Sequence, residues 1–285
     1  MRLCRFGSDR LGVVIGDQVH DVTPIQQELR SNAPYDMMGD AVISQLPKVR
    51  SRLEKTAKSV PGIPLSGVEL LPPVARPSKL IAAPVNYEKH IAEMAARSSD
   101  QPVAPRFIEV AGLFLKANSS LVGPSGVVPI EFPDRLNEHE VELVMIIGKT
   151  GKNISQADAL DYVAGYCLGL DMTVRGKEDR SFRKSLDGFS PIGPWMVTAD
   201  EIADPDDITI QLTVNGEIRQ RENTKHLIFS CRRLIEFASS YYTLYPGDVI
   251  FTGTPEGVGP VEAGDWMCAS APGLGELRIQ VAALT

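Results

Sequence analysis

The strongest constraint in this sequence is an apolar run that carries two glutamates. Residues 138–148 read E-H-E-V-E-L-V-M-I-I-G, and this alternating, β-branched pattern predicts a strand. Side chains two apart on a strand share a face, so Glu140 and Glu142 are expected to point the same way from a run apolar enough to be buried. Two such carboxylates repel each other and lose hydration unless a cation or protons compensate them. A hard divalent ion with oxygen ligands would do so, whereas the alternative is the solvated face of an edge strand.

Bulk composition narrows the class of protein. The chain has 285 residues, of which 43% are hydrophobic and 23% are charged, enough for one large core or two smaller ones. Its net charge of -7 argues against general binding to nucleic acid or anionic lipid, and an anionic substrate would need a locally positive site. No apolar run is long enough to span a bilayer, and the start of the chain lacks the apolar core of a signal peptide. These features, with four widely separated cysteines, predict a cytoplasmic protein with reduced thiols and no membrane partner.

Prolines divide the chain into two predicted domains. Residues 11–15 and 18–22 predict a hairpin around Gly16-Asp17, and residues 41–57 predict a helix. The segment 72–78 reads P-P-V-A-R-P-S, and clustered prolines stop both helices and strand ladders. We therefore predict a small N-terminal domain over residues 1–72 and a second domain over residues 73–285.

The second region places a possible general base on a helix. Residues 79–83 predict a strand that ends at Pro84, and residues 86–94 turn into a helix. His90 and Glu93 are three residues apart, so they lie on one helical face. A carboxylate beside an imidazole fixes its tautomer and raises its basicity, as a general base requires. The alternative is an ordinary solvated pair.

Two further apolar strands end in charged residues. Residues 112–116 end in Lys116, which is either a cationic anchor for a carboxylate or a surface residue. Residues 164–170 are followed by Asp171, which is either a third carboxylate ligand or a turn-forming aspartate. Residues 175–184 form a strongly charged loop. Asn215-Gly216 predicts a type I′ hairpin turn, and residues 226–242 have helical periodicity.

The glycine-rich loop at residues 253–259 could cradle an anion, but it lacks the Lys-Ser/Thr pair of a phosphate-binding loop. Several motifs occur in a specific order along the chain: Asn86-Tyr87-x-x-His90-x-x-Glu93, Lys116 with a Ser-rich turn, Glu140-x-Glu142, Asp171-Met172-Thr173, Lys184-Ser185-x-Asp187, and Gly253-Thr254-Pro255-x-Gly257. With these motifs the chain, from about Lys79 to its end, resembles the fumarylacetoacetate hydrolase family. Each motif alone is weak, but their order and spacing together are specific.

The resemblance implies a mixed α+β, mainly β fold: a β-roll catalytic domain with a small N-terminal domain, usually a homodimer. It also implies one bound Mg²⁺ or Mn²⁺, and in some members Ca²⁺. By the same resemblance the metal ligands would be Glu140, Glu142 and Asp171, and the catalytic residues His90, Glu93 and Lys184. The substrate contacts would be Lys116, Arg175, Gly253 and Thr254.

Two positions depart from the family pattern. Pro84 stands where members often have glycine before the Asn-Tyr motif, and a proline there stiffens the backbone. Glu178 stands where many members have glutamine. If that position touches substrate, Glu178 would alter selectivity or disfavour a second carboxylate.

These features lead to one hypothesis for the reaction. A small anionic 2-oxo acid, an acylpyruvate with a second carbonyl at C4, would chelate the cation, and water activated by His90 would attack the distal carbonyl. Cleavage would give pyruvate and a carboxylic acid. The alternatives are decarboxylation of oxaloacetate, isomerisation or decarboxylation of a 2-hydroxymuconate-type dienoate in aromatic catabolism, or a catalytically silent protein that keeps the metal site.

Overall fold

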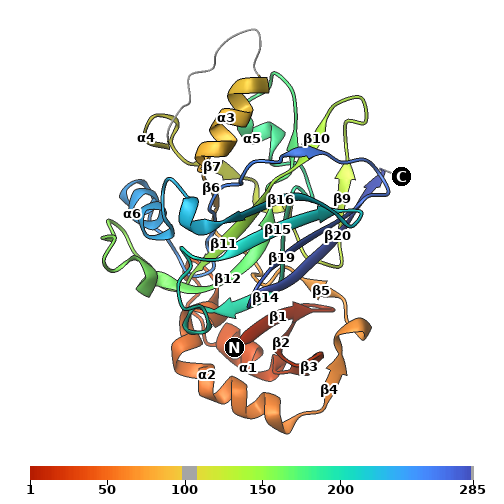
Figure 1. The fold of residues 1–285 in the computed structure, drawn as a ribbon. Helices are drawn as coiled ribbons and strands as arrows, with labels where there is room; N and C mark the ends of the chain where they lie inside the picture. Colours follow the sequence, from red (N-terminus) through yellow and green to blue (C-terminus); the bar gives the residue numbers. More distant parts are fainter. Residues whose placement is uncertain (98–107, 284–285) are drawn as a thin grey trace.

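Three β-sheets form the centre of the molecule in a computed structural model of the chain, which describes residues 1–97 and 108–283 (Figure 1). The largest sheet has the order β4-β3-β2-β1-β14-β12-β11-β17-β6-β7, with β5 paired to β1 and β8 paired to β14. Its strands are β1 (Arg2–Phe6), β2 (Arg10–Ile15), β3 (Gln18–Asp21), β4 (Gly62–Pro64), β5 (Leu70–Leu71), β6 (Leu80–Ala82), β7 (Phe114–Lys116), β8 (Leu121–Val122), β11 (Val141–Ile147), β12 (Val163–Leu170), β14 (Ser190–Thr198) and β17 (Val249–Phe251).

Two smaller sheets complete the β-structure. The five-stranded sheet has the order β16-β15-β19-β20-β9, and the three-stranded sheet has the order β13-β10-β18. Their strands are β9 (Val127–Ile130), β10 (Asn137–His139), β13 (Thr173–Val174), β15 (Thr209–Val214), β16 (Glu217–Asn223), β18 (Gly259–Pro260), β19 (Trp266–Ala271) and β20 (Gly275–Ala283). The predicted class, mixed α+β and mainly β, is confirmed.

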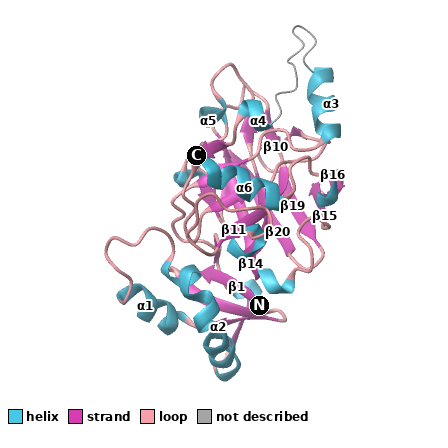
Figure 2. Cartoon of the chain, turned by 90° about the vertical axis from the view of Figure 1, so that its left-hand side faces the viewer, coloured by secondary structure: helices cyan, strands magenta, loops and turns pink. Residues whose placement is uncertain are grey.

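The α-helices lie at the two ends of the molecule and on one side (Figures 1 and 2). Helices α1 (Thr23–Ser31) and α2 (Ala41–Ser59) lie beside β1–β3. Helices α3 (Glu88–Arg97), α4 (Ile108–Ala111) and α5 (Arg180–Arg183) gather at the opposite end, and α6 (Cys231–Tyr241) lies on the side. Within the described ranges, none of the helices has both the length and the apolarity needed to cross a bilayer.

Strand β11 is the centre of the core because both of its faces are buried. Val141, Leu143 and Met145 belong to the apolar cluster that includes the inner faces of β15, β19 and β20. Val144 and Ile146 belong to a second cluster, which includes side chains of β1, β2 and α2. Burial on both sides explains why the run is almost continuously apolar.

The large sheet runs across the predicted domain boundary. Strand β1 pairs antiparallel with β14, with Leu3 opposite Met196. Residues on both sides of position 72 therefore share one sheet and one apolar cluster. The division into residues 1–72 and 73–285 stays a prediction.

Local signals placed most elements well. The hairpin around Gly16-Asp17 forms between β2 and β3, and α2 covers the helix predicted at 41–57 even though Pro47 lies inside it. Asn215 and Gly216 both have positive φ, 53° and 85°, as a type I′ turn requires.

The single strand predicted over residues 138–148 is wrong in one respect, because it breaks at Glu140. Strand β10 pairs with β13 and β18, whereas β11 pairs with β12 and β17. The backbone changes partners at Glu140, whose carbonyl accepts a hydrogen bond from the Asp171 N–H at 2.8 Å. This hydrogen bond at the break brings Glu140 and Asp171 together.

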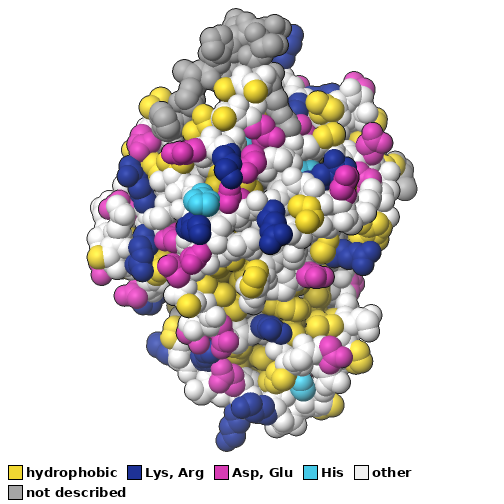
Figure 3. Space-filling model, in the orientation of Figure 1, with side chains coloured by type: hydrophobic (Ala, Val, Ile, Leu, Met, Phe, Trp, Pro, Cys, Tyr) yellow, Lys and Arg dark blue, Asp and Glu magenta, His cyan; other side chains and the backbone are white. Residues whose placement is uncertain are grey.

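Acidic and basic side chains are interspersed over the upper part of the face in Figure 3. Hydrophobic side chains gather below its centre, between the part that holds β1–β3 and the part that holds β15 and β19. The predicted homodimer stays a prediction.

We expect Asp248→Ala to destabilise the fold, because Asp248 ties the segment after the prolines to β17. Its fully buried carboxylate accepts hydrogen bonds from Ser78 Oγ (2.6 Å), Lys79 N (3.0 Å) and Tyr245 N (2.8 Å), and it pairs with Lys79 Nζ at 2.7 Å. Losing it should lower the free energy of unfolding by about 3 kcal/mol, since several half-buried donors lose their buried acceptor. Urea denaturation measures this, with exposed Asp161→Ala as the control. A loss below about 1 kcal/mol would contradict the assignment.

Candidate metal centre and active site

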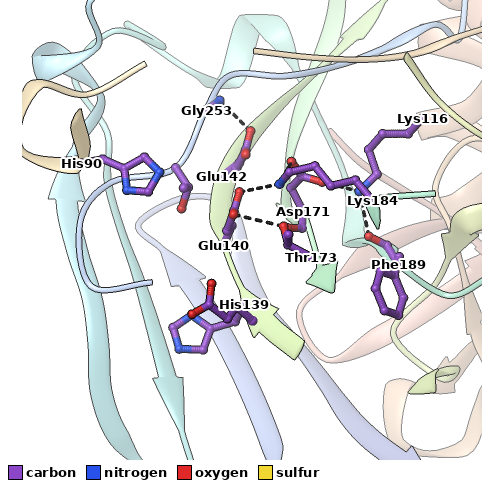
Figure 4. Close-up of polar contacts among 12 residues, drawn as sticks. His90, Lys116, His139, Glu140, Glu142, Asp171, Thr173, Lys184, Phe189 and Gly253 are labelled. Atoms are coloured by element: carbon purple, nitrogen blue, oxygen red, sulfur yellow. Dashed lines mark hydrogen bonds and ion pairs between the residues drawn. The ribbon is translucent and has the colours of Figure 1, made fainter. Parts of the chain in front are cut away.

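Three buried carboxylates meet at one point (Figure 4). Glu140, Glu142 and Asp171 each offer one oxygen, and these oxygens lie within 4.8 Å of one another. Glu140 lies at the break between β10 and β11, Glu142 on β11, and Asp171 directly after β12. Because Val141 pairs with Leu170 in the antiparallel ladder, the chain brings Asp171 beside Glu140. The three side chains predicted as metal ligands therefore lie together.

Two lysines compensate part of this negative charge. Lys184 Nζ donates to Glu140 Oε2 at 2.7 Å and to Asp171 Oδ2 at 2.6 Å. Burial would lower the pKa of Lys184, but the charges of Asp171 and Glu140 outweigh burial and raise it. Lys116 Nζ donates to Asp171 and to the Phe189 carbonyl at 2.8 Å, and burial lowers its pKa despite the pairing with Asp171.

The two glutamates differ in their electrostatic surroundings. Burial would raise the pKa of Glu140, but Lys184 and Arg175 outweigh burial and lower it to about 2. By contrast, burial and the charges of Asp171 and Glu140 raise the pKa of Glu142 well above its ordinary value, although the Gly253 N–H donates to Glu142 at 2.6 Å. Three converging carboxyl groups, one of them with a raised pKa that a bound cation would lower, fit a hard divalent cation.

His90 and Glu93 form the predicted pair at the start of α3. His90 is buried, and its Nδ1 lies 3.0 Å from Glu93 Oε2. The helix is held in place by fully buried Asn86, whose side chain donates to the carbonyls of Phe229 (2.9 Å) and Thr252 (2.8 Å). Gly253 has φ of +103°, and a Cβ there would meet Asn86 Cβ at 2.5 Å, so this contact requires glycine.

A cavity of about 120 Å³ opens onto this cluster. Six of the residues predicted for the site line it: His90, Glu140, Asp171, Arg175, Lys184 and Thr254. In Figure 4 His90 lies on one side of the glutamates, and Lys184 and Lys116 lie on the other. The other predicted residues surround these. Lys116 bonds to the carboxylate of Asp171, the Gly253 N–H bonds to the carboxylate of Glu142, and Glu93 lies beside His90.

Residues 79–282 match the family model described as fumarylacetoacetate (FAA) hydrolase C-terminal. The chain belongs to the fumarylacetoacetate hydrolase family. It is 50% identical over 285 residues to maleylpyruvate hydrolase of Aquipseudomonas alcaligenes, a match that covers 99% of both chains. The crystal structure of maleylpyruvate hydrolase from Sphingobium sp. SYK-6 in complex with manganese(II) ion and pyruvate has a TM-score of 0.85 and 39% identity, with 100% of both chains covered. A bifunctional isomerase/decarboxylase of 4-hydroxyphenylacetate degradation from Salmonella dublin is 37% identical over 214 residues, which cover 73% of this chain and 48% of that protein.

The two departures from the fumarylacetoacetate hydrolase pattern have different places in the structure. Pro84 lines the cavity, and the next residue, Val85, has a φ of 45°, which is unusual for a β-branched residue. Glu178 does not line the cavity; its exposed carboxylate accepts hydrogen bonds from Arg135 NH1 (3.2 Å) and NH2 (2.8 Å). Glu178 is therefore bound to Arg135 and does not face the acidic cluster.

No role was evident for Gln220 from the sequence, although its side chain orients the Thr254 hydroxyl in the cavity. The buried Gln220 Nε2 donates to Thr254 Oγ1 at 2.8 Å, and its Oε1 accepts from Val141 N at 2.9 Å. Because Oε1 is an acceptor, the nearby His139 Nδ1 (3.1 Å) must donate to it. The Thr254 oxygen is thus an acceptor for Gln220, which leaves its proton for a ligand in the cavity.

Sequence reasoning also missed Arg180 and Arg183, which line the cavity together with Phe114 and Met94. The charged run at 175–184 was the available signal, but it did not say which side chains face inward.

We expect Glu140→Ala and Glu142→Ala each to weaken Mn²⁺ binding by at least about 100-fold, because loss of a ligand should cost more than the 10–100-fold typical of residues behind the ligands. Isothermal titration calorimetry on the purified chain measures this affinity. Glu178→Ala, which removes a carboxylate outside the cavity, should bind Mn²⁺ as the unchanged chain does. Wild-type affinity in either ligand variant would remove that residue from the ligand set.

Proposed function

We propose that this chain hydrolyses a C–C bond in a small acylpyruvate (a 2,4-dioxo acid) in a metal-dependent reaction, giving pyruvate and a carboxylic acid. The observation that carries the proposal is that His90 and Lys184 line the same small cavity as the carboxylates of Glu140 and Asp171. Two similarities support it: 50% identity to a maleylpyruvate hydrolase, and likeness to a relative's structure that holds manganese(II) and pyruvate.

The proposed cation ligands are Glu140, Glu142 and Asp171, and their all-oxygen donor set suits Mg²⁺ or Mn²⁺, with Ca²⁺ also compatible. When bound, such an ion supplies a Lewis acid for the 2-oxo acid end of the substrate. Lys116 and Gly253 were predicted as substrate contacts, and their bonds to Asp171 and Glu142 support a role in positioning these ligands.

His90 is the proposed general base for water. Because the Glu93 carboxylate accepts a hydrogen bond, Nδ1 of His90 carries the proton and Nε2 keeps its lone pair. That lone pair removes a proton from the water that attacks the distal carbonyl. Glu93 is itself held by the Gly257 N–H at 3.2 Å, so both members of the pair have fixed positions.

Lys184 is the proposed stabiliser of the oxyanion that forms at the attacked carbon. An ammonium group has three N–H donors, and the bonds to Glu140 and Asp171 use two of them. The third is left for the substrate oxygen, where pre-placed positive charge contributes a few kcal/mol. Arg175 and Thr254 are the proposed contacts for the rest of the 2-oxo acid.

The sequence and the resemblance to the family support further proposals about the protein in the cell. We propose that it works as a cytoplasmic homodimer, without nucleic-acid or membrane partners, on a small anionic 2-oxo acid.

Pyruvate release across an acylpyruvate panel tests the reaction directly. Acetylpyruvate and fumarylpyruvate, with Mg²⁺ or Mn²⁺ added, should lose diketone absorbance, and each molecule consumed should yield one molecule of pyruvate. Addition of a chelator should abolish turnover, and renewed Mn²⁺ should restore it, because the cation activates the 2-oxo acid end. No turnover of any acylpyruvate would reject the hydrolase proposal.

His90→Ala separates hydrolysis from the second candidate, decarboxylation or isomerisation, which the relative named as a bifunctional isomerase/decarboxylase supports. Decarboxylation of oxaloacetate needs the cation but no attacking water. The variant should therefore lose hydrolysis by about 100-fold or more, the usual contribution of a general base. Turnover of oxaloacetate, where the unchanged chain shows it, should persist. Hydrolysis at the wild-type rate would show that His90 is not the base.

A further inference from the structure

The segment between β13 and α5 carries a residue of the proposed site at its start. Arg175 directly follows β13 and lines the cavity, and Lys184 lines it from the far end of α5. Residues 176–179, between Arg175 and α5, are exposed and lie outside the cavity. Exposed backbone keeps a fixed course only where other parts of the chain hold it. The contacts that hold this segment therefore decide where Arg175 lies.

The side chain of Arg135 bonds to both ends of the segment 175–178. Its Nε donates to the Arg175 carbonyl at 2.7 Å. Its NH1 and NH2 donate to the two oxygens of the Glu178 carboxylate, at 3.2 Å and 2.8 Å. The guanidinium thus uses all three nitrogens, and it meets the carboxylate with the two-pronged geometry to which arginine is suited.

Arg135 is itself fixed to the strand that leads to Glu140. It lies in a turn that its own N–H closes by donating to the Phe132 carbonyl at 3.1 Å. Asn137, the buried first residue of β10, donates from Nδ2 to the carbonyls of Phe132 (3.0 Å) and Arg135 (2.9 Å). The Arg135 guanidinium lies over the Phe132 ring, 4.8 Å from its centroid. Arg135 therefore ties the segment 175–178 to β10.

Two neighbouring contacts agree with this arrangement. Gly176 lies so close to the ion pair that a Cβ there would collide with Arg135 NH2 and Glu178 Oε2. Phe182 of α5 packs on Phe132, with the ring centroids 6.2 Å apart. The same turn therefore contacts the segment and the helix that follows it.

We propose that Arg135 is a positioning residue for this site: with Glu178 as its partner, it holds residues 175–178 against β10 and so fixes Arg175 for contact with the substrate. This inference rests on the proposed function, in which Arg175 contacts the 2-oxo acid. It also gives Glu178, one of the two departures from the family pattern, a role that acts through Arg135 and not on the substrate.

Loss of this contact should raise KM rather than lower kcat. Lys184, the proposed oxyanion stabiliser, keeps its bonds to Glu140 and Asp171 without it. Arg175, by contrast, loses the donor that holds its carbonyl. A variant that is merely less stable has fewer active molecules, so it lowers kcat and leaves KM unchanged. The split between KM and kcat therefore separates positioning from stability.

Steady-state kinetics of the Mn²⁺-loaded full chain test the proposal, with the acylpyruvate of the panel that is turned over best. Arg135→Gln, which loses all three bonds, should raise KM by about 10-fold. Glu178→Gln should raise KM by about 3-fold, since an amide offers one acceptor oxygen and an NH2 group that repels the facing N–H of Arg135. In both variants kcat should change by less than about 2-fold.

A control variant and a double variant make these changes specific. Arg52 forms the same kind of ion pair with Glu28, between α2 and α1 and outside the cavity, so Arg52→Gln should keep the wild-type KM. R135Q/E178Q should have the KM of R135Q, because Glu178 acts through Arg135. A further rise of about 3-fold in the double variant would show that Glu178 itself meets the substrate, and it would overturn the proposal.

Hydrogen exchange tests the contact apart from the reaction. In Arg135→Gln the amides of residues 175–184 should exchange at least about 5-fold faster than in the unchanged chain, while those of α2 keep their wild-type rates. Wild-type exchange together with a wild-type KM would overturn the proposal, and so would a lower kcat with an unchanged KM. Faster exchange in a chain that releases no pyruvate would refute the reaction and keep the role of Arg135 in holding the segment.

Discussion

The structure depends on burying three carboxylates at a single point in the protein. Removing charged groups from water is costly unless opposite charge meets them, so Glu140, Glu142 and Asp171 require cations close by. Lys184 and Lys116 supply two positive charges for three carboxylates, and burial together with the charges of Asp171 and Glu140 keeps the pKa of Glu142 raised. A divalent ion held by the three carboxylates would supply the remaining positive charge.

Several distant segments converge because of this requirement. Lys116 ends β7, Lys184 follows α5, and the Gly253 N–H follows β17. Each bonds to at least one of the carboxylates, so the ends of these elements are fixed relative to β11. Two further buried side chains hold the residues around this cluster. Asn86 anchors the helix that carries His90, and Gln220 orients Thr254. Preorganisation of this kind is what a hydrolytic site needs.

The sequence predicted the local features and the members of the site better than their long-range arrangement. Alternation and turn residues predicted β11 and the hairpin at Asn215, because both signals depend on neighbouring residues. The proposed set of three acidic ligands followed from the resemblance together with simple rules: two glutamates two apart, and an aspartate after an apolar strand. The pairing of β1 with β14 was not predictable, because no local pattern encodes the partner of a strand nearly two hundred residues away. The break at Glu140, the Arg135–Glu178 pair and the inward direction of Arg180 likewise depend on tertiary contacts.

A crystal structure of the chain with Mg²⁺ and oxalate, an analogue of the 2-oxo acid end, tests directly whether the three carboxylates bind one cation. We expect one ion bound at about 2.1 Å by an oxygen from each of Glu140, Glu142 and Asp171, with oxalate completing its coordination. An ion bound elsewhere, or the three carboxylates bonded to lysines alone at saturating Mg²⁺, would contradict it.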